Sequence, residues 1–175
     1  MLLQQFQYQL FADYFQFYVQ DENPKDTTEH IWDNKRTVEI GLALGQGIIA
    51  VGTERNFTVP FTLEIHDSEP EDDLSVWDRV NECNLEVPSG TLVIFGCTDY
   101  RPDAARVKID PRCYRARIYY GGLETVTDFD KGDDHYKMAL WAAPFSEMKI
   151  LKERIMKTWE SQNGNTNENS QTCGC

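Results

Sequence analysis

The sequence has no apolar run of the roughly 18 or more residues that a membrane-spanning helix needs, and its start lacks the basic and then apolar layout of a secretory signal peptide. Positive charge is also scarce, because 17 Lys and Arg residues stand against 29 Asp and Glu residues, for a formal net charge of −12. Such an excess repels phosphate backbones, whose neutralisation requires Lys and Arg. We therefore expect a cytoplasmic protein that acts without a membrane and without direct contact with nucleic acid.

Patterns that bind metals or phosphates are equally scarce. The three histidines, His30, His66 and His135, do not have the i, i+4 spacing of a helical zinc site. The glycines between Gly41 and Gly52 lie in a strand-like context without a following helix, so they do not form a phosphate-binding loop. We expect no cofactor.

The five cysteines are an odd number and are too widely spaced for a disulfide framework. Cys83, Cys97 and Cys113 lie in apolar segments, which favours free thiols that pack as small hydrophobic side chains in a reducing compartment. The final Cys173-Gly174-Cys175 resembles a double-prenylation signal, and two thiols can also bind a soft metal. No basic stretch directly precedes it, which favours an ordinary chain end without an anchor.

The composition that remains is typical of one folded domain. The chain has 175 residues, 41% of them hydrophobic and 12% aromatic, which is enough for a core. From Phe57 to His66, apolar and polar side chains alternate, as in a half-buried strand. The run Leu92-Val93-Ile94-Phe95 is apolar throughout and predicts a central strand covered on both faces. Alternation recurs in residues 83–87, 105–109, 114–118 and 136–140.

Short strands between regular turns, with no helical segments separating them, predict an all-β fold: an antiparallel β-sandwich of about eight or nine strands within residues 1–144. Pro60 cannot donate to a ladder, which predicts a sheet edge or a bulge there. The alternation changes parity around Ala12-Asp13-Tyr14, which predicts a bulge or bend where the first strand passes from one sheet to the other. Gly45-Gln46-Gly47 predicts a hairpin, with a short helix after Trp32-Asp33 as the alternative.

The C-terminal part has a different pattern. Ser146 can cap a helix, and apolar residues follow at helical spacing in Met148, Leu151, Ile155 and Trp159. These features predict an amphipathic helix over residues 145–160, packed on the domain. Residues 161–175 are mostly polar and cannot offset an ordering entropy of about 1–2 kcal/mol per residue, so we expect a disordered tail.

Acidic side chains gather in two expected connections between strands. The candidate partner-binding residues are Asp67, Glu69, Glu71, Asp72 and Asp73 in the first segment and Asp128, Asp130, Asp133 and Asp134 in the second.

These segments have three interpretations. They can form a docking surface for a basic protein, whose association the carboxylates would steer. They can bind calcium, which takes about six to eight oxygen ligands. Asp128-Phe129-Asp130-Lys131-Gly132 resembles the start of a calcium loop, although the third ligand and the downstream Glu of that loop are missing. Finally, they can be solvated loops that only keep the protein soluble.

A thiol-dependent enzyme is a further alternative, with Cys97 or Cys113 placed beside His66 or His135. No local catalytic motif surrounds these residues, so we expect no catalysis.

A series of motifs, in their order along the chain, resembles the bacterial competence protein J family over about residues 6–144. The motifs are Tyr14-Phe15-Gln16-Phe17, Trp32, Gly47-Ile48-Ile49, Thr58-Val59-Pro60-Phe61, Leu85-Glu86-Val87-Pro88-Ser89-Gly90, and Tyr136 to Trp141 with Pro144. Residues 99–122 and everything after Pro144 fall outside this pattern. The resemblance implies a compact β protein and a role as an inhibitor of a DNA-entry nuclease.

The charge pattern and the resemblance agree on one expectation. We expect a non-catalytic, acidic, intracellular binding protein that engages a basic protein partner through the two acidic segments. A nuclease inhibitor or a toxin-neutralising, immunity-like protein is its most concrete form. A calcium-binding β-sandwich module and a thiol-dependent enzyme remain the alternatives.

Overall fold

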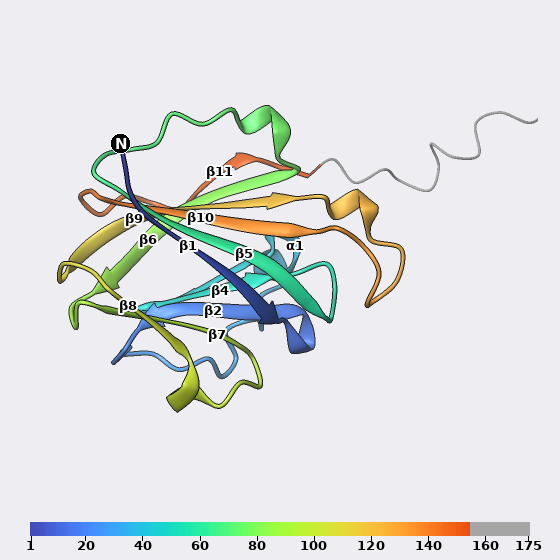
Figure 1. Ribbon diagram of the computed structural model, residues 1–175, viewed down its shortest axis with the longest axis horizontal. Coiled ribbons are helices and arrows are strands. Elements are labelled where there is room, and N and C mark those ends of the chain that lie inside the picture. Colours follow the sequence, from blue (N-terminus) through green and yellow to red (C-terminus); the bar gives the residue numbers. More distant parts are fainter. Residues whose placement is uncertain (155–175) are drawn as a thin grey trace, which may run out of the picture.

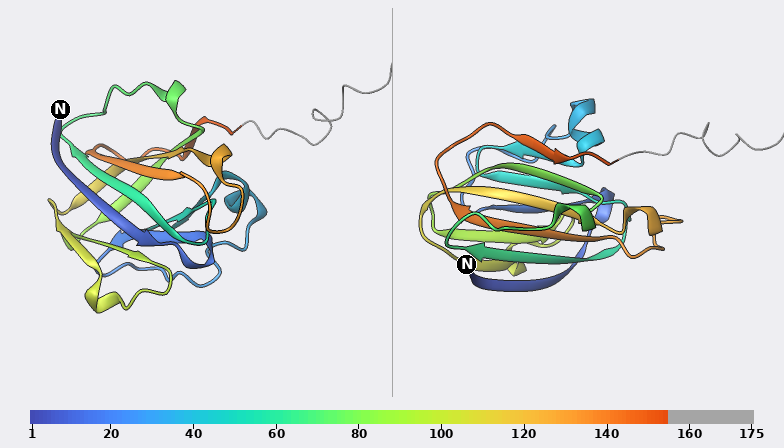
Figure 2. Two further views of the ribbon diagram at one scale, coloured as in Figure 1. Left: turned by 45° about the vertical axis from the view of Figure 1, so that its right-hand side comes forward. Right: turned by 90° about the horizontal axis from the view of Figure 1, so that it is seen from above.

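Two β-sheets stack face to face in the computed structural model, which describes residues 1–154 (Figure 1 and Figure 2). The six-stranded sheet has the order β1 (Leu2–Phe11), β5 (Thr58–His66), β10 (His135–Ala142), β9 (Arg112–Gly121), β6 (Arg79–Val87) and β11 (Lys149–Lys152). The five-stranded sheet has the order β3 (Leu42–Gly45), β4 (Ile48–Gly52), β2 (Gln16–Asp21), β7 (Thr91–Gly96) and β8 (Ala105–Lys108). The predicted all-β antiparallel sandwich is confirmed, with 11 strands in residues 1–154 where about eight or nine were expected.

The core lies between the sheets and follows from the two-residue alternation. In β5, Val59, Phe61 and Leu63 are buried and point inward, whereas Thr62 and Glu64 lie on the opposite face. β7 is buried at every position, which confirms the predicted central strand. Its neighbours are β2 and β8.

The predicted change of parity near the N-terminus is also confirmed. β1 pairs with β5 in one sheet, and β2 pairs with β4 and β7 in the other. Between them lies the single turn η1 (Asp13–Phe15), in which Tyr14 and Phe15 have φ values of 54° and 58°. This left-handed conformation turns the chain from one layer to the next.

The prediction for Pro60 needs a correction, because β5 is an interior strand. It is antiparallel to β1 and parallel to β10. Pro60 is tolerated because pairing with β10 begins one residue later, at Phe61, so Pro60 has a strand neighbour on the β1 side only.

Both interpretations of the region after Trp32 hold in part. A short helix, α1 (Lys35–Ile40), begins after Asn34, whose side chain accepts from the Arg36 amide, and ends at Gly41 with φ 67°. β3 and β4 then form the predicted hairpin. Among the described residues, no helix is long and apolar enough to cross a membrane.

The predicted helix over residues 145–160 is corrected in its described part. Lys149–Lys152 forms β11, which pairs with β6 through Ile150 and Asn81. The physical reason is tertiary, because Arg115 binds the Ser146 and Glu147 carbonyls at 2.8 and 2.9 Å, and a helix would need those carbonyls for its own hydrogen bonds. The remainder of the predicted helix, the predicted tail and the terminal cysteine pair lie outside the described residues.

Candidate protein-binding site

The first acidic segment crosses the outer face of the six-stranded sheet. It leaves β5 after His66, passes over β10 and β9, forms the turn η2 (Leu74–Val76) and enters β6 (the green connection at the top of Figure 1). The side chains of β9 and β10 beneath it are those that face away from the core, including Arg117, Tyr119 and Lys137. The sheet therefore provides a rigid floor for residues 67–73.

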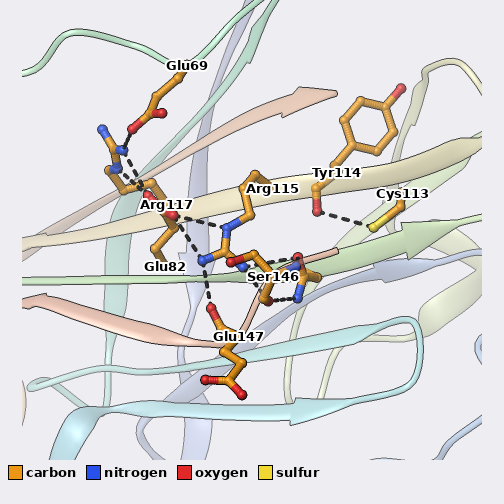
Figure 3. A network of polar contacts seen from close by, with 9 residues as sticks. Glu69, Glu82, Cys113, Tyr114, Arg115, Arg117, Ser146 and Glu147 are labelled. Carbon is orange, nitrogen blue, oxygen red and sulfur yellow. Dashed lines mark hydrogen bonds and ion pairs between the residues drawn. The ribbon is translucent and has the colours of Figure 1, made fainter. Parts of the chain in front are cut away.

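A buried ion network anchors this floor (Figure 3). Glu82 of β6 is 6% exposed and forms ion pairs with Arg115 and Arg117. These two arginines lie on the same face of β9 and are 3% and 5% exposed. Arg115 Nε lies 3.0 Å from one carboxylate oxygen of Glu82, and Arg117 Nη2 lies 2.8 Å from the other. Two guanidinium groups thus share one buried carboxylate, which leaves a positive charge for a second anion.

Glu69 of the acidic segment provides that second anion. Its carboxylate forms an ion pair with Arg117, and Arg117 also donates to the Pro70 carbonyl at 3.1 Å. Burial opposes the charge of Arg117, but its hydrogen bonds to Glu82 and Glu69 outweigh that effect and raise the pKa of the guanidinium. The Arg117 guanidinium also stacks on Trp141, 5.1 Å from the ring centroid.

Asp72 makes the second anchor. Its carboxylate accepts from the Tyr119 hydroxyl and lies 3.3 Å from Lys137 Nζ. Partial burial works against the ionised form, but the hydrogen bond from Tyr119 and the charge of Lys137 prevail and lower the pKa of Asp72. Asp72 is therefore half-buried and bound to the sheet.

The other carboxylates of the segment face solvent. Asp67, Glu69, Glu71 and Asp73 are exposed, and Glu69 keeps 64% of its side chain accessible despite its ion pair. Asp73 accepts from the Ser75 amide at 2.8 Å and thereby caps η2, and these hydrogen bonds lower its pKa. A fixed backbone thus presents a row of exposed negative charges.

The second acidic segment lies in the connection between β9 and β10, after the turn η4 (Leu123–Thr125). Asp128 and Asp133 are exposed and Asp130 is half-buried. Asp134 is fully buried, where it pairs with Arg55 and accepts from the Tyr136 hydroxyl at 2.6 Å. Asp134 is therefore a structural residue and is not among the exposed carboxylates of the segment.

The two connections that carry the acidic segments contact each other through residues outside those segments. The Leu123 amide donates to Asp78 at 2.8 Å, and the Trp77 ring lies 5.5 Å from the His135 ring. These contacts join the end of the β5–β6 connection to the start and the end of the β9–β10 connection.

The described residues provide no set of ligands for the calcium-binding alternative. Within residues 1–154, no three His, Cys, Asp or Glu side chains converge as metal ligands would. The carboxylates of the first segment instead contact Arg117, Tyr119 and Lys137.

For the thiol-enzyme alternative, the contacts of the described residues include no cysteine paired with a histidine. His66 contacts Glu64 at 3.1 Å, and His135 contacts the Asp133 carbonyl at 3.0 Å. Burial raises the pKa of Cys113, the direction opposite to activation, and Cys97 lies 3.8 Å from the Tyr18 hydroxyl.

These features define a class: a two-layer β-sandwich that carries an anchored acidic segment on the outer face of one sheet. No protein-family model matches the sequence, and no curated protein matches it either. Among solved structures, the fold is similar to that of ComJ from Bacillus subtilis, an inhibitor of the DNA-degrading activity of NucA, with a TM-score of 0.61 and 15% identity over 82% of this chain and 98% of that one. It is also similar to crocagin biosynthetic gene J, with a TM-score of 0.53 and 13% identity over 79% of this chain and 96% of that one. The resemblance seen in the sequence is thereby confirmed at the level of the fold.

The network beneath the first acidic segment is not apparent from the sequence. Arg115 and Arg117 alternate with Tyr114, Ala116 and Ile118, a pattern that indicates a strand with one polar face. A covered polar face and a solvated one have the same alternation, so only the path of the connection shows that Glu69 covers Arg117.

Proposed function

We propose that this protein is a non-catalytic inhibitor of a basic enzyme, and that it occupies the partner's nucleic-acid groove with the exposed carboxylates of the two acidic segments. The partner is a nuclease or a nuclease-like toxin, and the inhibitor acts inside the cell. The observation that carries this proposal is the anchoring of residues 67–73 by Arg117, Tyr119 and Lys137.

Anchoring matters because a flexible acidic loop must be ordered when it binds. Ordering costs about 1–2 kcal/mol of backbone entropy per residue. Glu69 and Asp72 already hold the segment on the sheet, so the exposed Glu71 and Asp73 need little further ordering. Preorganised negative charge also steers a basic partner and accelerates association.

The choice of partner rests on charge and on the fold. A protein with a net charge of −12 repels nucleic acid but attracts the cationic groove that an enzyme uses to bind it. ComJ, whose fold is similar, inhibits the DNA-degrading activity of NucA. Inhibition by this chain is the corresponding proposal.

The test is a DNA-degradation assay with NucA and, in parallel, with any basic nuclease encoded beside this protein's gene. The test variant combines Glu69→Gln, Glu71→Gln and Asp73→Asn, and the control variant combines Glu29→Gln, Asp33→Asn and Asp103→Asn, which are exposed residues outside both segments. The net charge of the two variants is identical. We expect the unmodified protein and the control variant to inhibit, and the test variant to inhibit more weakly. We also expect inhibition to be weaker at about 500 mM NaCl than at about 50 mM NaCl.

Three results would contradict the proposal. If neither nuclease is inhibited, the assignment as a nuclease inhibitor fails. If the test variant inhibits as well as the control does, residues 67–73 are not part of the binding surface. If inhibition is insensitive to salt, the exposed carboxylates do not drive binding.

A further inference from the structure

A groove of about 870 Å³ opens at the end of the sandwich, between η1, α1 and the start of β6, and its lining includes no residue of either acidic segment. Its walls include Tyr14, Phe15, Trp32 and Val38, and its inner end includes Arg79 and Tyr120. The volume lies within the range of ligand-binding clefts, about 300–1,000 Å³.

The aromatic wall is held in a strained conformation. Tyr14 and Phe15 are consecutive non-glycine residues with positive φ, a conformation that costs about 1–2 kcal/mol for each residue. Both remain exposed, at 70% and 46%, and Val38 is 61% exposed. Strained backbone conformations persist only where the surrounding structure maintains them, and they occur most often at ligand-binding and active sites.

The remainder of the wall is rigid. Trp32 Nε1 donates to the Gln16 side chain at 2.5 Å, and the same oxygen accepts from the Tyr18 hydroxyl at 2.7 Å. The Trp32 ring also packs close to Gly52 of β4. Its indole is therefore oriented independently of any ligand.

Charge distinguishes the inner end of the groove. Arg154 pairs with Glu54 at 2.8 Å and Glu39 pairs with Lys35 at 3.6 Å, so these lining charges are compensated. The Arg79 guanidinium forms no ion pair with any carboxylate of residues 1–154, and it lies 5.3 Å from the centroid of the Tyr120 ring. A single uncompensated cation in an aromatic groove attracts an anion that brings its own apolar surface.

An adjoining cavity of about 270 Å³ shares Arg79 and is also lined by Asn81. Asn81 donates to the Ile40 carbonyl at 2.9 Å, but its buried Oδ1 accepts no hydrogen bond from the described residues. A buried acceptor without a donor is unfavourable by about 1–3 kcal/mol. A ligand that carries N–H groups next to its anion would suit this end of the groove.

We propose that this groove binds a peptide segment of a partner protein in which a bulky apolar side chain adjoins a carboxylate, with the carboxylate on Arg79 and the apolar side chain between Phe15 and Trp32. A peptide suits the site better than a small metabolite does, because the rim is open and its exposed Tyr14 and Phe15, its half-buried Trp32 and its Arg79 are of residue types enriched at protein–protein interfaces. The groove selects the opposite charge from the acidic segments, so it does not depend on the inhibitor proposal.

The test uses two blocked tripeptides, acetyl-Gly-Gly-Phe with a free carboxylate and its C-terminal amide. Binding to the full chain is measured by titration calorimetry and by the shift of the Trp32 indole resonance. We expect the acid to bind and to shift the Trp32 resonance, and the amide to bind about tenfold more weakly.

The matched variants are Arg79→Gln and Arg106→Gln, each of which removes one positive charge. Arg106 is the control because it lies on the other sheet and pairs with Glu22. Arg79→Gln should reduce the affinity for the acid about tenfold and leave that for the amide unchanged, and Arg106→Gln should change neither. Arg79→Lys should retain part of the preference for the acid. That result would show that Arg79→Gln acts by removing the charge and not by disturbing the fold.

Several outcomes would overturn the proposal. Equal binding of acid and amide, or an unchanged affinity in Arg79→Gln, removes the role of Arg79. No shift at Trp32 places the peptide elsewhere. A dimer that dissociates on Phe15→Ala would assign the groove to a second copy of this chain. Tighter peptide binding after Trp159→Ala would assign it to the chain's own C-terminal residues.

Discussion

Arg117 donates to one oxygen of Glu82 through two nitrogens, Nε at 3.0 Å and Nη2 at 2.8 Å. Both side chains are buried, and Arg115 occupies the other oxygen of Glu82. The attraction within such a group offsets its desolvation only while every member is present. Removing the shared anion leaves Arg115 without a carboxylate partner and leaves Arg117 with Glu69 alone.

Glu82→Gln should lower the free energy of unfolding by about 3–5 kcal/mol, because it uncouples both arginines from a buried charge. Urea titration followed by circular dichroism measures the loss. Glu86→Gln on the same strand is the matched control and should stay within about 0.5 kcal/mol of the unmodified protein. Equal losses for the two variants would show that the network does not stabilise the fold.

A comparable loss is expected at the second buried carboxylate. Asp134 pairs with Arg55 and accepts from the Tyr136 hydroxyl, and it is 0% exposed. Asp134→Asn should lower the free energy of unfolding by about 3–5 kcal/mol, whereas Asp133→Asn, at an exposed neighbour, should change it by less than about 0.5 kcal/mol. Thermal unfolding of the two variants side by side decides whether Asp134 is structural.

The stability should depend on Asp72 in acid. The folded-state pKa of Asp72 is lowered from its ordinary value of 3.8, so the unfolded state binds a proton more readily than the folded state does. The contribution of Asp72 is therefore complete above the unfolded pKa and is lost as the pH falls through the folded pKa. Melting temperatures from about pH 6 to about pH 2 should fall less steeply for Asp72→Asn than for the unmodified protein. Lys137→Met should reduce the same dependence, and parallel curves for all three proteins would refute this account.

The thiols of the buried Cys83 and the half-buried Cys113 should react slowly. Burial raises the pKa of Cys83 to about 12 and also raises that of Cys113, so few thiolates exist at neutral pH. Iodoacetamide should label both residues slowly in the native protein and rapidly in urea, as located by peptide mass spectrometry. Rapid native labelling of Cys113 would restore the thiol-enzyme alternative.

One substitution in the groove should stabilise the protein. Tyr14 is 70% exposed and has φ 54°, so Tyr14→Gly removes backbone strain while it loses little burial. We expect a gain of about 0.5–1 kcal/mol together with weaker binding of acetyl-Gly-Gly-Phe. Tyr100→Gly is the matched control, because Tyr100 is 72% exposed with φ −70°, and it should not stabilise. A loss of stability in Tyr14→Gly would show that the turn is not strained.

Local patterns in the sequence predicted the layers well. Alternation between Phe57 and His66 reports which side chains face the core, and the parity change near Asp13 reports the transfer between sheets, because each depends only on neighbouring residues. The error at Pro60 arose because the strand order of a sheet is not a local property. Nothing near Pro60 indicates that β10 will pair in parallel from Phe61 onward.

The candidate site was predictable only in part. The exposed carboxylates of residues 67–73 could be identified from their density, but the burial of Asp134 depends on Arg55, which is distant in sequence. The same limit explains the C-terminal error, since Met148 and Leu151 have helical spacing while Arg115 holds the Ser146 and Glu147 carbonyls. Long-range polar contacts leave no periodicity to detect.

The parallel pairing of β5 with β10 has a consequence for biosynthesis. β5 is made early, but Phe61 can join Tyr136 only after the ribosome has released residues far downstream. The acidic segment, translated before β9, therefore has no support until nearly all the described chain has emerged. A stop codon anywhere before β10 should abolish the whole surface and leave no partly active fragment.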